Sequence, residues 1–216
     1  MTRTVSLLAL VALVVMSGCV GFITGDSAFS ASSEPAIVPD SDLPETGYEA
    51  GETQSQRLNR TVEVAGQERQ VNLTLWTSMY TKTPENATSV EGAARNSSSV
   101  ALVSLPGIEI AGQSLNPLDI VSTDVLFELA DRGAGSVERE KIGTAEYTML
   151  ESNTTADVYR VQKEGGDGNN TAIIEMASVQ HEGDLIVALA TYPEGAGENA
   201  NVGTLLRNIE HPAERP

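Results

Sequence analysis

The feature that most restricts what this chain can become is an apolar run near its start that closes on its only cysteine. Residues 5–15 carry no charge and follow Arg3, and the small residues Ser17 and Gly18 stand directly before Cys19. A positive start, a short apolar segment and small residues at a cleavage point are the parts of a secretory signal. A cysteine just after that point is what a lipoprotein signal adds, because its thiolate takes a thioether-linked lipid.

We therefore predict a lipoprotein signal peptide at residues 1–18 and lipidation of Cys19. The alternative is an uncleaved membrane anchor, but a spanning helix needs about 20 apolar residues. The run reaches that length only if it extends to Ile23 across several small and polar residues. The lack of a twin-arginine pair favours the general secretory route without deciding it. Because one acyl chain anchors weakly and two anchor stably, we expect a two-chain lipid that holds the protein on the extracellular face of the cell membrane.

Export with a single cysteine limits how the mature domain is stabilised. It has no second thiol for a disulfide or a zinc ribbon, so its core alone must hold it together. Residues 19–39 are rich in Ser, Ala, Gly and Pro, which predicts a lipid-anchored flexible tether. We place a single domain at 40–211, long enough to bury a sizeable core, and a frayed polar tail at 212–216.

Charge is the strongest compositional signal. The chain carries 30 Asp and Glu against 13 Lys and Arg, a net charge of −17, and its lysines are Lys82, Lys141 and Lys163. Such a surface repels nucleic acid, which is bound through Lys and Arg, and repels anionic lipid headgroups. A disordered acidic chain is disfavoured because 40% of the residues are apolar. At about 1 M salt, where the Debye length is about 3 Å, dense carboxylates keep a protein soluble. We therefore expect a halophilic archaeal source.

Alternating and continuous apolar stretches predict a chain made mainly of strands. The clearest hairpin runs from 172–181 to 184–192 around a turn at Glu182 and Gly183. Within it, residues 185–190 are apolar at both parities, which predicts a central strand covered on both faces. The other strands that the patterns predict are 61–64, 71–76, 100–105, 108–110, 137–141, 144–150 and 156–161, with a first edge strand at 28–31 and 36–38 as the alternative to the tether there.

Two helices follow from apolar stripes at helical spacing. Residues 122–132 carry one stripe, and residues 198–210 carry another at i, i+3, i+4 and i+7. The order of elements predicts an α+β fold: a mainly antiparallel β-sheet with a mid-chain helix and a C-terminal helix packed on it, an α/β sandwich. The stripe residues are Val125, Leu126 and Leu129 in the first helix and Val202, Leu205, Leu206 and Ile209 in the second.

Several segments carry a resemblance that reaches over nearly the whole chain. They are M-S-G-C-V-G-F at 16–22, F-S-A at 29–31, E-T-G-Y-E at 45–49, I-E-I-A-G-Q-S-L-N-P at 108–117, and 187–193 with the ending at 205–211. Together they resemble an uncharacterised family of haloarchaeal lipoproteins, a domain of unknown function. The resemblance implies a haloarchaeal source, export and lipidation of Cys19, and it supplies no substrate and no active site. The element order is also similar, as a fold, to the sandwich of the PsbP and Mog1-like proteins, which are binding and assembly factors.

No motif predicts a catalytic residue, a metal site or a cofactor. The H-E-x-x-H, G-x-S-x-G and Walker A patterns do not occur. Both histidines, His181 at the hairpin turn and His211 in the tail, are expected to be solvated. Residues 195–200 match a dinucleotide loop only in spacing, because no strand follows to close a βαβ unit. Residues 167–170 resemble part of a calcium loop but lack its bidentate Glu. In so acidic a chain no carboxylate pair can be singled out.

Two further sets of residues are candidates for surface roles. Trp76 and Tyr80 share one face of a predicted strand, and we expect them to pack beneath a helix, with an exposed aromatic patch as the alternative. Six N-x-S/T sequons are candidate glycan acceptors in an exported chain. Loop positions are the better candidates, because strand pairing hinders the transferase. The loop sequons are Asn86, Asn96, Asn153 and Asn169, and those in or near strands are Asn59 and Asn72.

These observations favour a non-enzymatic, lipid-anchored surface domain that binds an envelope partner or helps to assemble an envelope complex. A cell-surface hydrolase with an unidentified carboxylate pair and a small solute-binding lipoprotein are the alternatives. We expect no nucleic-acid partner, and the sequence identifies no small-molecule ligand. A pocket with two close, buried carboxylates would favour the hydrolase, whereas a flat or aromatic-rimmed sheet face would favour a binding domain.

Overall fold

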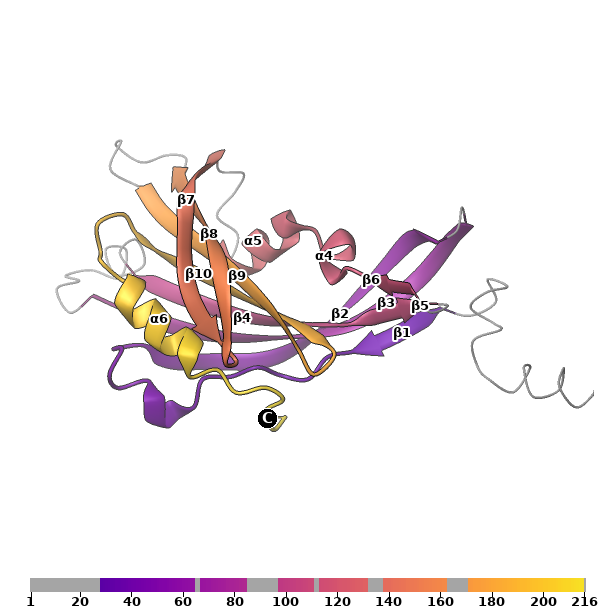
Figure 1. The fold of residues 1–216 in the computed structure, drawn as a ribbon, viewed down its shortest axis with the longest axis horizontal. Coiled ribbons are helices and arrows are strands. Elements are labelled where there is room, and N and C mark those ends of the chain that lie inside the picture. The colour runs from indigo at the N-terminus through magenta and orange to yellow at the C-terminus, as the bar shows by residue number, and fades with distance from the viewer. Residues whose placement is uncertain are drawn as a thin grey trace, which may run out of the picture.

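One large twisted sheet forms the centre of the molecule in the computed structural model (Figure 1). The structure describes residues 28–64, 67–84, 97–110, 113–131, 138–162 and 171–215. The strands of the large sheet are β1 (Phe29–Ser32), β2 (Glu49–Val64), β3 (Gln67–Lys82), β4 (Ser98–Pro106), β7 (Glu138–Met149), β8 (Ser152–Gln162), β9 (Thr171–His181) and β10 (Asp184–Pro193).

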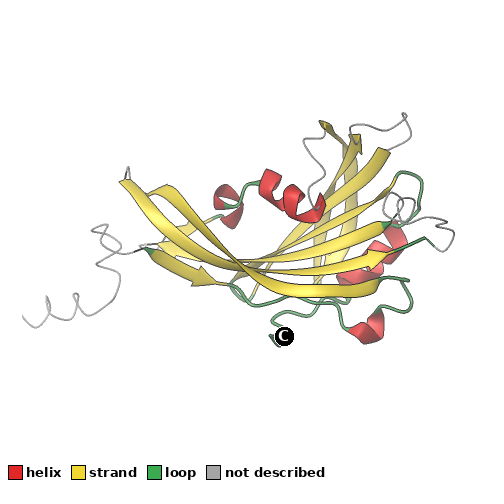
Figure 2. Cartoon of the chain, turned by 180° about the vertical axis from the view of Figure 1, so that it is seen from behind, coloured by secondary structure: helices red, strands yellow, loops and turns green. Residues whose placement is uncertain are grey.

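The strand order is β1-β3-β4-β10-β9-β8-β7, with β2 paired along β3. Every pair is antiparallel except β1 with β3, which run parallel. The long β3 strand holds β2 on one side, and on its other side it holds first β1 and then β4. Seen from behind, the β2–β3 pair reaches across the whole molecule (Figure 2). The predicted mainly antiparallel sheet is therefore confirmed.

β10 is the central strand that its sequence predicts. It pairs with β4 on one side and β9 on the other, and each of its residues from Asp184 to Tyr192 is buried. A strand that is apolar at both parities needs a covered sheet on both faces, and here both faces are covered. The predicted turn at Glu182 and Gly183 closes the β9–β10 hairpin, with positive φ angles of 47° and 92° that suit a tight two-residue turn.

Two separate cores lie on the two faces of the sheet. One contains Leu73, Leu105 and Leu126, beneath the helix α5 (Thr123–Asp131), and the other contains Ile186 and Leu205, beneath the helix α6 (Asn199–Arg207). The α+β arrangement with a mid-chain and a C-terminal helix is thus confirmed, as is the burial of the apolar stripe of the last helix. In the described part of the chain, no helix has the length and apolar character to span a membrane. The remaining elements are η1 (Asp40–Asp42), β5 (Ile108–Ile110), β6 (Gln113–Leu115), α4 (Pro117–Ile120), α5 (Thr123–Asp131) and α6 (Asn199–Arg207).

The predicted tether at 19–39 runs too far into the domain. Phe29–Ser32 pairs with Val71–Thr74 as strand β1, so the first-strand alternative is correct for this part. Ala36 and Val38 are only 1% and 2% exposed, packed in the core beneath α6. The composition of this segment predicts flexibility, but strand pairing of 29–32 with β3 and burial of Ala36 and Val38 hold it against the sheet.

Strand β2 is much longer than the predicted 61–64. Residues 49–60 show no apolar alternation, because most of their side chains are exposed. Backbone pairing with β3 holds them, and that pairing leaves no periodic signal in the side chains. Conversely, the two predicted strands at 137–141 and 144–150 form one strand, β7, with an irregularity between Lys141 and Gly143.

Candidate functional site

A buried carboxylate lies where the C-terminal helix meets the sheet. Glu175 of β9 is 3% exposed, and one of its oxygens accepts hydrogen bonds from Tyr192 Oη at 2.7 Å and Asn199 Nδ2 at 2.8 Å. Its other oxygen accepts from the hydroxyl of Tyr147 on β7. A buried ionised group is costly unless it is bonded, and here three donors from three different elements satisfy it. We call Glu175, Tyr147, Tyr192 and Asn199 the Glu175 cluster.

The electrostatics of the Glu175 cluster keep its tyrosines neutral. Burial raises the pKa of Tyr147 and of Tyr192 well above the ordinary value, and the neighbouring Glu175 carboxylate raises both further. Both phenols therefore remain protonated and continue to donate over the physiological pH range. The cluster is a fixed hydrogen-bonded support for α6, because its carboxylate oxygens are already occupied.

A second buried carboxylate stands at the start of α6. Glu198, 6% exposed, pairs with Lys82 of β3 at 2.9 Å and accepts a hydrogen bond from Asn201 Nδ2 at 2.9 Å. The Lys82 ammonium also lies 5.7 Å from the ring centroid of Tyr48. Residues 195–200, which match a dinucleotide loop only in spacing, thus contain Glu198, which anchors the helix to the sheet. Glu198 and Glu175 together hold the first turn of α6 in place.

A polar groove runs between α6 and strand β7, beside the Glu175 cluster. Its volume is about 690 Å³. Gly203 of α6 faces the ring of Tyr147, and a Cβ there would stand 3.4 Å from Tyr147 Cε1, in ordinary van der Waals contact. We call this cavity the β7–α6 groove, and its lining residues are Glu146, Tyr147, Thr148, Asn153, Asn199, Ala200, Gly203, Thr204 and Arg207.

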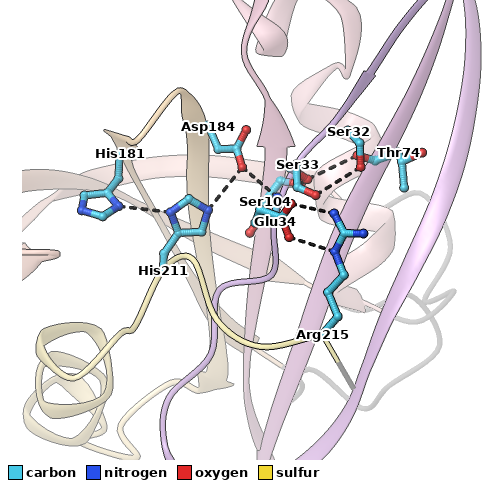
Figure 3. Close-up of polar contacts among 9 residues, drawn as sticks. All are labelled: Ser32, Ser33, Glu34, Thr74, Ser104, His181, Asp184, His211 and Arg215. Atoms are coloured by element: carbon cyan, nitrogen blue, oxygen red, sulfur yellow. Dashed lines mark hydrogen bonds and ion pairs between the residues drawn. The ribbon is translucent and has the colours of Figure 1, made fainter.

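The two histidines, both predicted to be solvated, come together with an aspartate instead (Figure 3). His211 Nε2 lies 3.2 Å from Asp184 Oδ2, and His211 Nδ1 lies 3.1 Å from His181 Nδ1. The side chain of His211 is only 1% exposed, so the prediction for His211 is wrong. Its ring is buried because the tail packs against the start of β10. His181 is half-buried rather than fully solvated.

The geometry of the histidine pair is that of a hydrogen bond. The two ring centroids are 5.4 Å apart and the two Nδ1 atoms are 3.1 Å apart. The difference is about twice the distance from an imidazole centroid to a ring atom. The two nitrogens therefore point at each other along the line that joins the rings. With neutral rings, His211 donates from Nε2 to Asp184 and accepts from His181 at Nδ1. In the described ranges no three or more His, Cys, Asp or Glu side chains gather so as to hold a metal ion.

Asp184 links this chain of hydrogen bonds to the N-terminal segment. Its Oδ2 accepts from the backbone N–H of Glu34 at 2.8 Å. Burial raises the pKa of Asp184 above its usual value, while the Glu34 N–H and His211 act in the opposite direction. The arrangement joins three parts of the chain that are far apart in sequence, the start of the domain, β10 and the tail.

The tail that was predicted to be frayed, 212–216, is held against the domain as far as Arg215, its last described residue. The Ala213 N–H donates to the carbonyl of Pro35 at 2.9 Å, and the Arg215 guanidinium pairs with the Glu34 carboxylate at 2.6 Å (Figure 3). The polar composition of the tail predicts a free segment, but hydrogen bonds and an ion pair hold it, because the neighbouring 34–35 segment supplies a carbonyl and a carboxylate. We call the contacts of 33–37 with 210–215, together with Asp184 and His211, the terminal clasp.

The predicted modification sites are distributed unevenly over the described residues. Asn153 lies in β8 rather than in a loop, directly after the β7–β8 turn, and its exposed side chain borders the β7–α6 groove. Asn59 and Asn72 are exposed and stand opposite each other on β2 and β3. Cys19 and the sequons Asn86, Asn96 and Asn169 lie outside the described residues, as do residues 167–170.

The aromatic residues of β3 divide between core and surface. Tyr80 is 3% exposed, and the backbone N–H of Val38 donates to its hydroxyl at 2.6 Å, so Tyr80 is packed in the core as expected. Trp76 is half-buried on the same face.

No sequence motif pointed to the Glu175 cluster, but the sequence contains one signal for it: Glu175 interrupts the apolar stretch 172–177 of a predicted strand. A charge at such a position is buried only when partners await it.

Comparison with known proteins matches most of the chain to a family of unknown function. A family model described as "Domain of unknown function (DUF6517)" matches residues 35–210. Among solved structures, the solution structure of cyanobacterial PsbP (CyanoP) from Synechocystis sp. PCC 6803 is similar, with 14% sequence identity and a TM-score of 0.38. That similarity covers 82% of this chain and 92% of that chain. No curated protein matches.

Proposed function

The chain belongs to the family described as a domain of unknown function (DUF6517), and we propose that it is an exported, lipid-anchored binding domain of the outer cell surface. Its role is to hold a polar envelope partner rather than to catalyse a reaction. The apolar run that closes on Cys19 supports the export and the anchor. A net charge of −17 with three lysines supports a surface that works in concentrated salt, as in a halophilic archaeon.

The observation that best supports a binding role is that both buried glutamates already have bonding partners within the protein. A hydrolase with paired carboxylates needs both of them to face the substrate at a distance suited to acid–base work. Here Glu175 is saturated by three donors, and Glu198 is paired with Lys82. Tyr147 and Asn199 line the β7–α6 groove, but their polar atoms are turned to Glu175. The buried carboxylates therefore shape the wall of the groove and are not free to react.

The lining of the β7–α6 groove suggests the chemistry of its partner. Apart from the groups bound to Glu175, it offers the hydroxyls of Thr148 and Thr204 and the carboxamide of Asn153, with one acid, Glu146, and one base, Arg207. Thr155 Oγ1 already donates to Glu146 at 2.9 Å. Such a lining is suited to hydrogen-bonding a polar ligand without strong charge, such as a glycan chain or an extended peptide of an envelope protein.

A substitution that fills the groove tests this role. Thr204 of α6 is half-buried in the groove wall, so Thr204→Trp places a large ring within the groove, and Thr61→Trp makes the same change on exposed β2, away from the groove. The full chain and both variants are incubated with native cell envelope and recovered with their bound components. We expect a component retained by the wild type and Thr61→Trp to be lost from Thr204→Trp. Equal retention by all three would contradict binding in the groove.

A further inference from the structure

The outer face of β1, β2 and β3 carries a second cavity whose lining differs from the rest of this acidic chain. The strand registers place the lining side chains in two rows, Ser30–Asn72–Asn59 and Ser32–Thr74–Arg57. These residues line a cavity of about 510 Å³, together with Ala31 and Leu73. We call the six polar residues of the two rows the outer-face patch; Figure 3 shows two of them, Ser32 and Thr74, across the β1–β3 pair.

The outer-face patch is positive, although the protein as a whole is strongly negative. Arg57 is its only charged member, and none of the described residues that line the cavity is an Asp or Glu, in a chain with 30 of them. Within the described ranges no carboxylate pairs with Arg57, whereas Arg139, Arg160 and Arg215 each hold one. Glu34, which follows the β1 part of the patch, is itself bound by Arg215. The patch therefore combines one unneutralised guanidinium with carboxamide and hydroxyl donors.

The position of the patch relates it to the membrane. Phe29, the first residue of β1, stands ten residues after Cys19 in the sequence. At about 3.3–3.6 Å per extended residue, that segment spans at most about 36 Å. A lipid on Cys19 would therefore hold β1, and the patch beside it, within about 36 Å of the headgroup layer, a distance that still allows the patch to touch it.

We propose that the outer-face patch binds the phosphate of an anionic membrane lipid headgroup, an inference that rests on the lipid anchor proposed above. A guanidinium binds two phosphate oxygens at once, and the neighbouring amides and hydroxyls supply further donors. The remaining surface, which is rich in carboxylates, is repelled by anionic headgroups. A site without carboxylates beside the anchor lets the domain rest on the membrane and turns the β7–α6 groove toward its partner in one orientation.

The test compares two arginines of one strand. Arg57 and Arg60 are both exposed on β2 but point to opposite faces, because Arg57 pairs with Thr74 and Arg60 with the core residue Val71. The substitutions Arg57→Gln and Arg60→Gln remove the same charge, so only contact with the patch separates them. At molar salt the Debye length is about 3 Å, so long-range attraction contributes little and the difference reports direct contact.

The full chain and both variants, in neutral detergent micelles at molar salt, are titrated with phosphatidylglycerol, phosphatidylcholine and inorganic phosphate. The fluorescence of Trp76, the only tryptophan and the next residue on this face of β3, reports binding. We expect saturable binding of phosphatidylglycerol by the wild type and Arg60→Gln, and roughly tenfold weaker binding by Arg57→Gln. Circular dichroism confirms that each variant is folded.

Three outcomes would overturn the proposal. Equal loss in both variants would show a general effect of charge, and equal binding of phosphatidylcholine would show no preference for an anionic lipid. Inorganic phosphate that saturates the site at the same concentration as the lipid would show a site for free phosphate. None of these outcomes depends on whether Cys19 is lipidated, because the micelles present the lipid directly. Failure of the anchor and failure of the patch are thus separate results.

Discussion

Asn199, the first residue of α6, donates its side-chain amide to Glu175 of β9 at 2.8 Å. This contact joins the C-terminal helix to the second-last strand through a carboxylate that is buried in the sheet. Because Tyr147 and Tyr192 bind the same carboxylate, one glutamate organises β7, β9, β10 and α6. The shape of the β7–α6 groove depends on this arrangement.

Removal of the Glu175 side chain is expected to destabilise the fold strongly. Glu175→Ala leaves the buried Tyr192 hydroxyl and the half-buried Tyr147 hydroxyl without a partner and frees the exposed Asn199 amide, which together cost about 3 kcal/mol of unfolding free energy. Urea unfolding at molar salt measures the loss. The control is Glu194→Ala, which removes an exposed carboxylate paired with Arg160 and is expected to change stability little. Similar midpoints for the two variants would contradict the role of the Glu175 cluster.

The tyrosines of the Glu175 cluster predict a loss of stability at alkaline pH. Burial and Glu175 raise the native pKa of Tyr147 and Tyr192 above the ordinary value of 10.0. Above pH 10 the unfolded chain releases phenolic protons that the native state retains, so the unfolding free energy falls as pH rises. Near-ultraviolet absorbance is expected to show tyrosinate only as the protein unfolds, and Tyr192→Phe to flatten the pH dependence. Tyrosinate formation near pH 10 in the folded wild type that is absent from folded Tyr192→Phe would refute this.

The terminal clasp predicts different effects for the two histidines. His211→Ala removes the imidazole bonded to the Asp184 carboxylate, with an expected cost of about 1–3 kcal/mol. His181→Ala removes only the outer, half-buried ring and is expected to cost less. Hydrogen exchange at the paired amides of Ile37 and Glu210 should accelerate far more in His211→Ala. Unchanged protection of both amides would show that the clasp does not depend on His211.

The sequence predicted those parts of the fold that leave a periodic pattern in the side chains. β10 is apolar at both parities, and α6 carries a complete stripe, so both were placed within a few residues. Residues 49–60 of β2 have no such pattern, because backbone pairing holds them on an exposed edge. The candidate site was harder to predict from the sequence than the fold. His211 and Asp184 are 27 residues apart, and they meet because the tail after α6 packs against the start of β10.

Glycosylation is expected at Asn153 and not at Asn59 or Asn72. Asn153 pairs with Thr148, but it is exposed and is the second residue of β8, beside the β7–β8 turn, so it is more accessible to a transferase than Asn59 and Asn72 in the middle of the β2–β3 pair. Asn59 and Asn72 face each other within the outer-face patch, and a glycan there would exclude the lipid headgroup. Glycopeptide mass spectrometry of the native protein decides the question. A glycan on Asn59 or Asn72 would exclude the proposed headgroup site on those molecules.

The most direct test of the account is the mass of the native polypeptide, isolated from cells and separated into membrane and cytosolic fractions. We predict that it is recovered with the membrane, begins at Cys19 and carries the added mass of a two-chain lipid on that residue. A native chain found in the cytosol that begins at Met1 and carries no added lipid mass would contradict the proposed function.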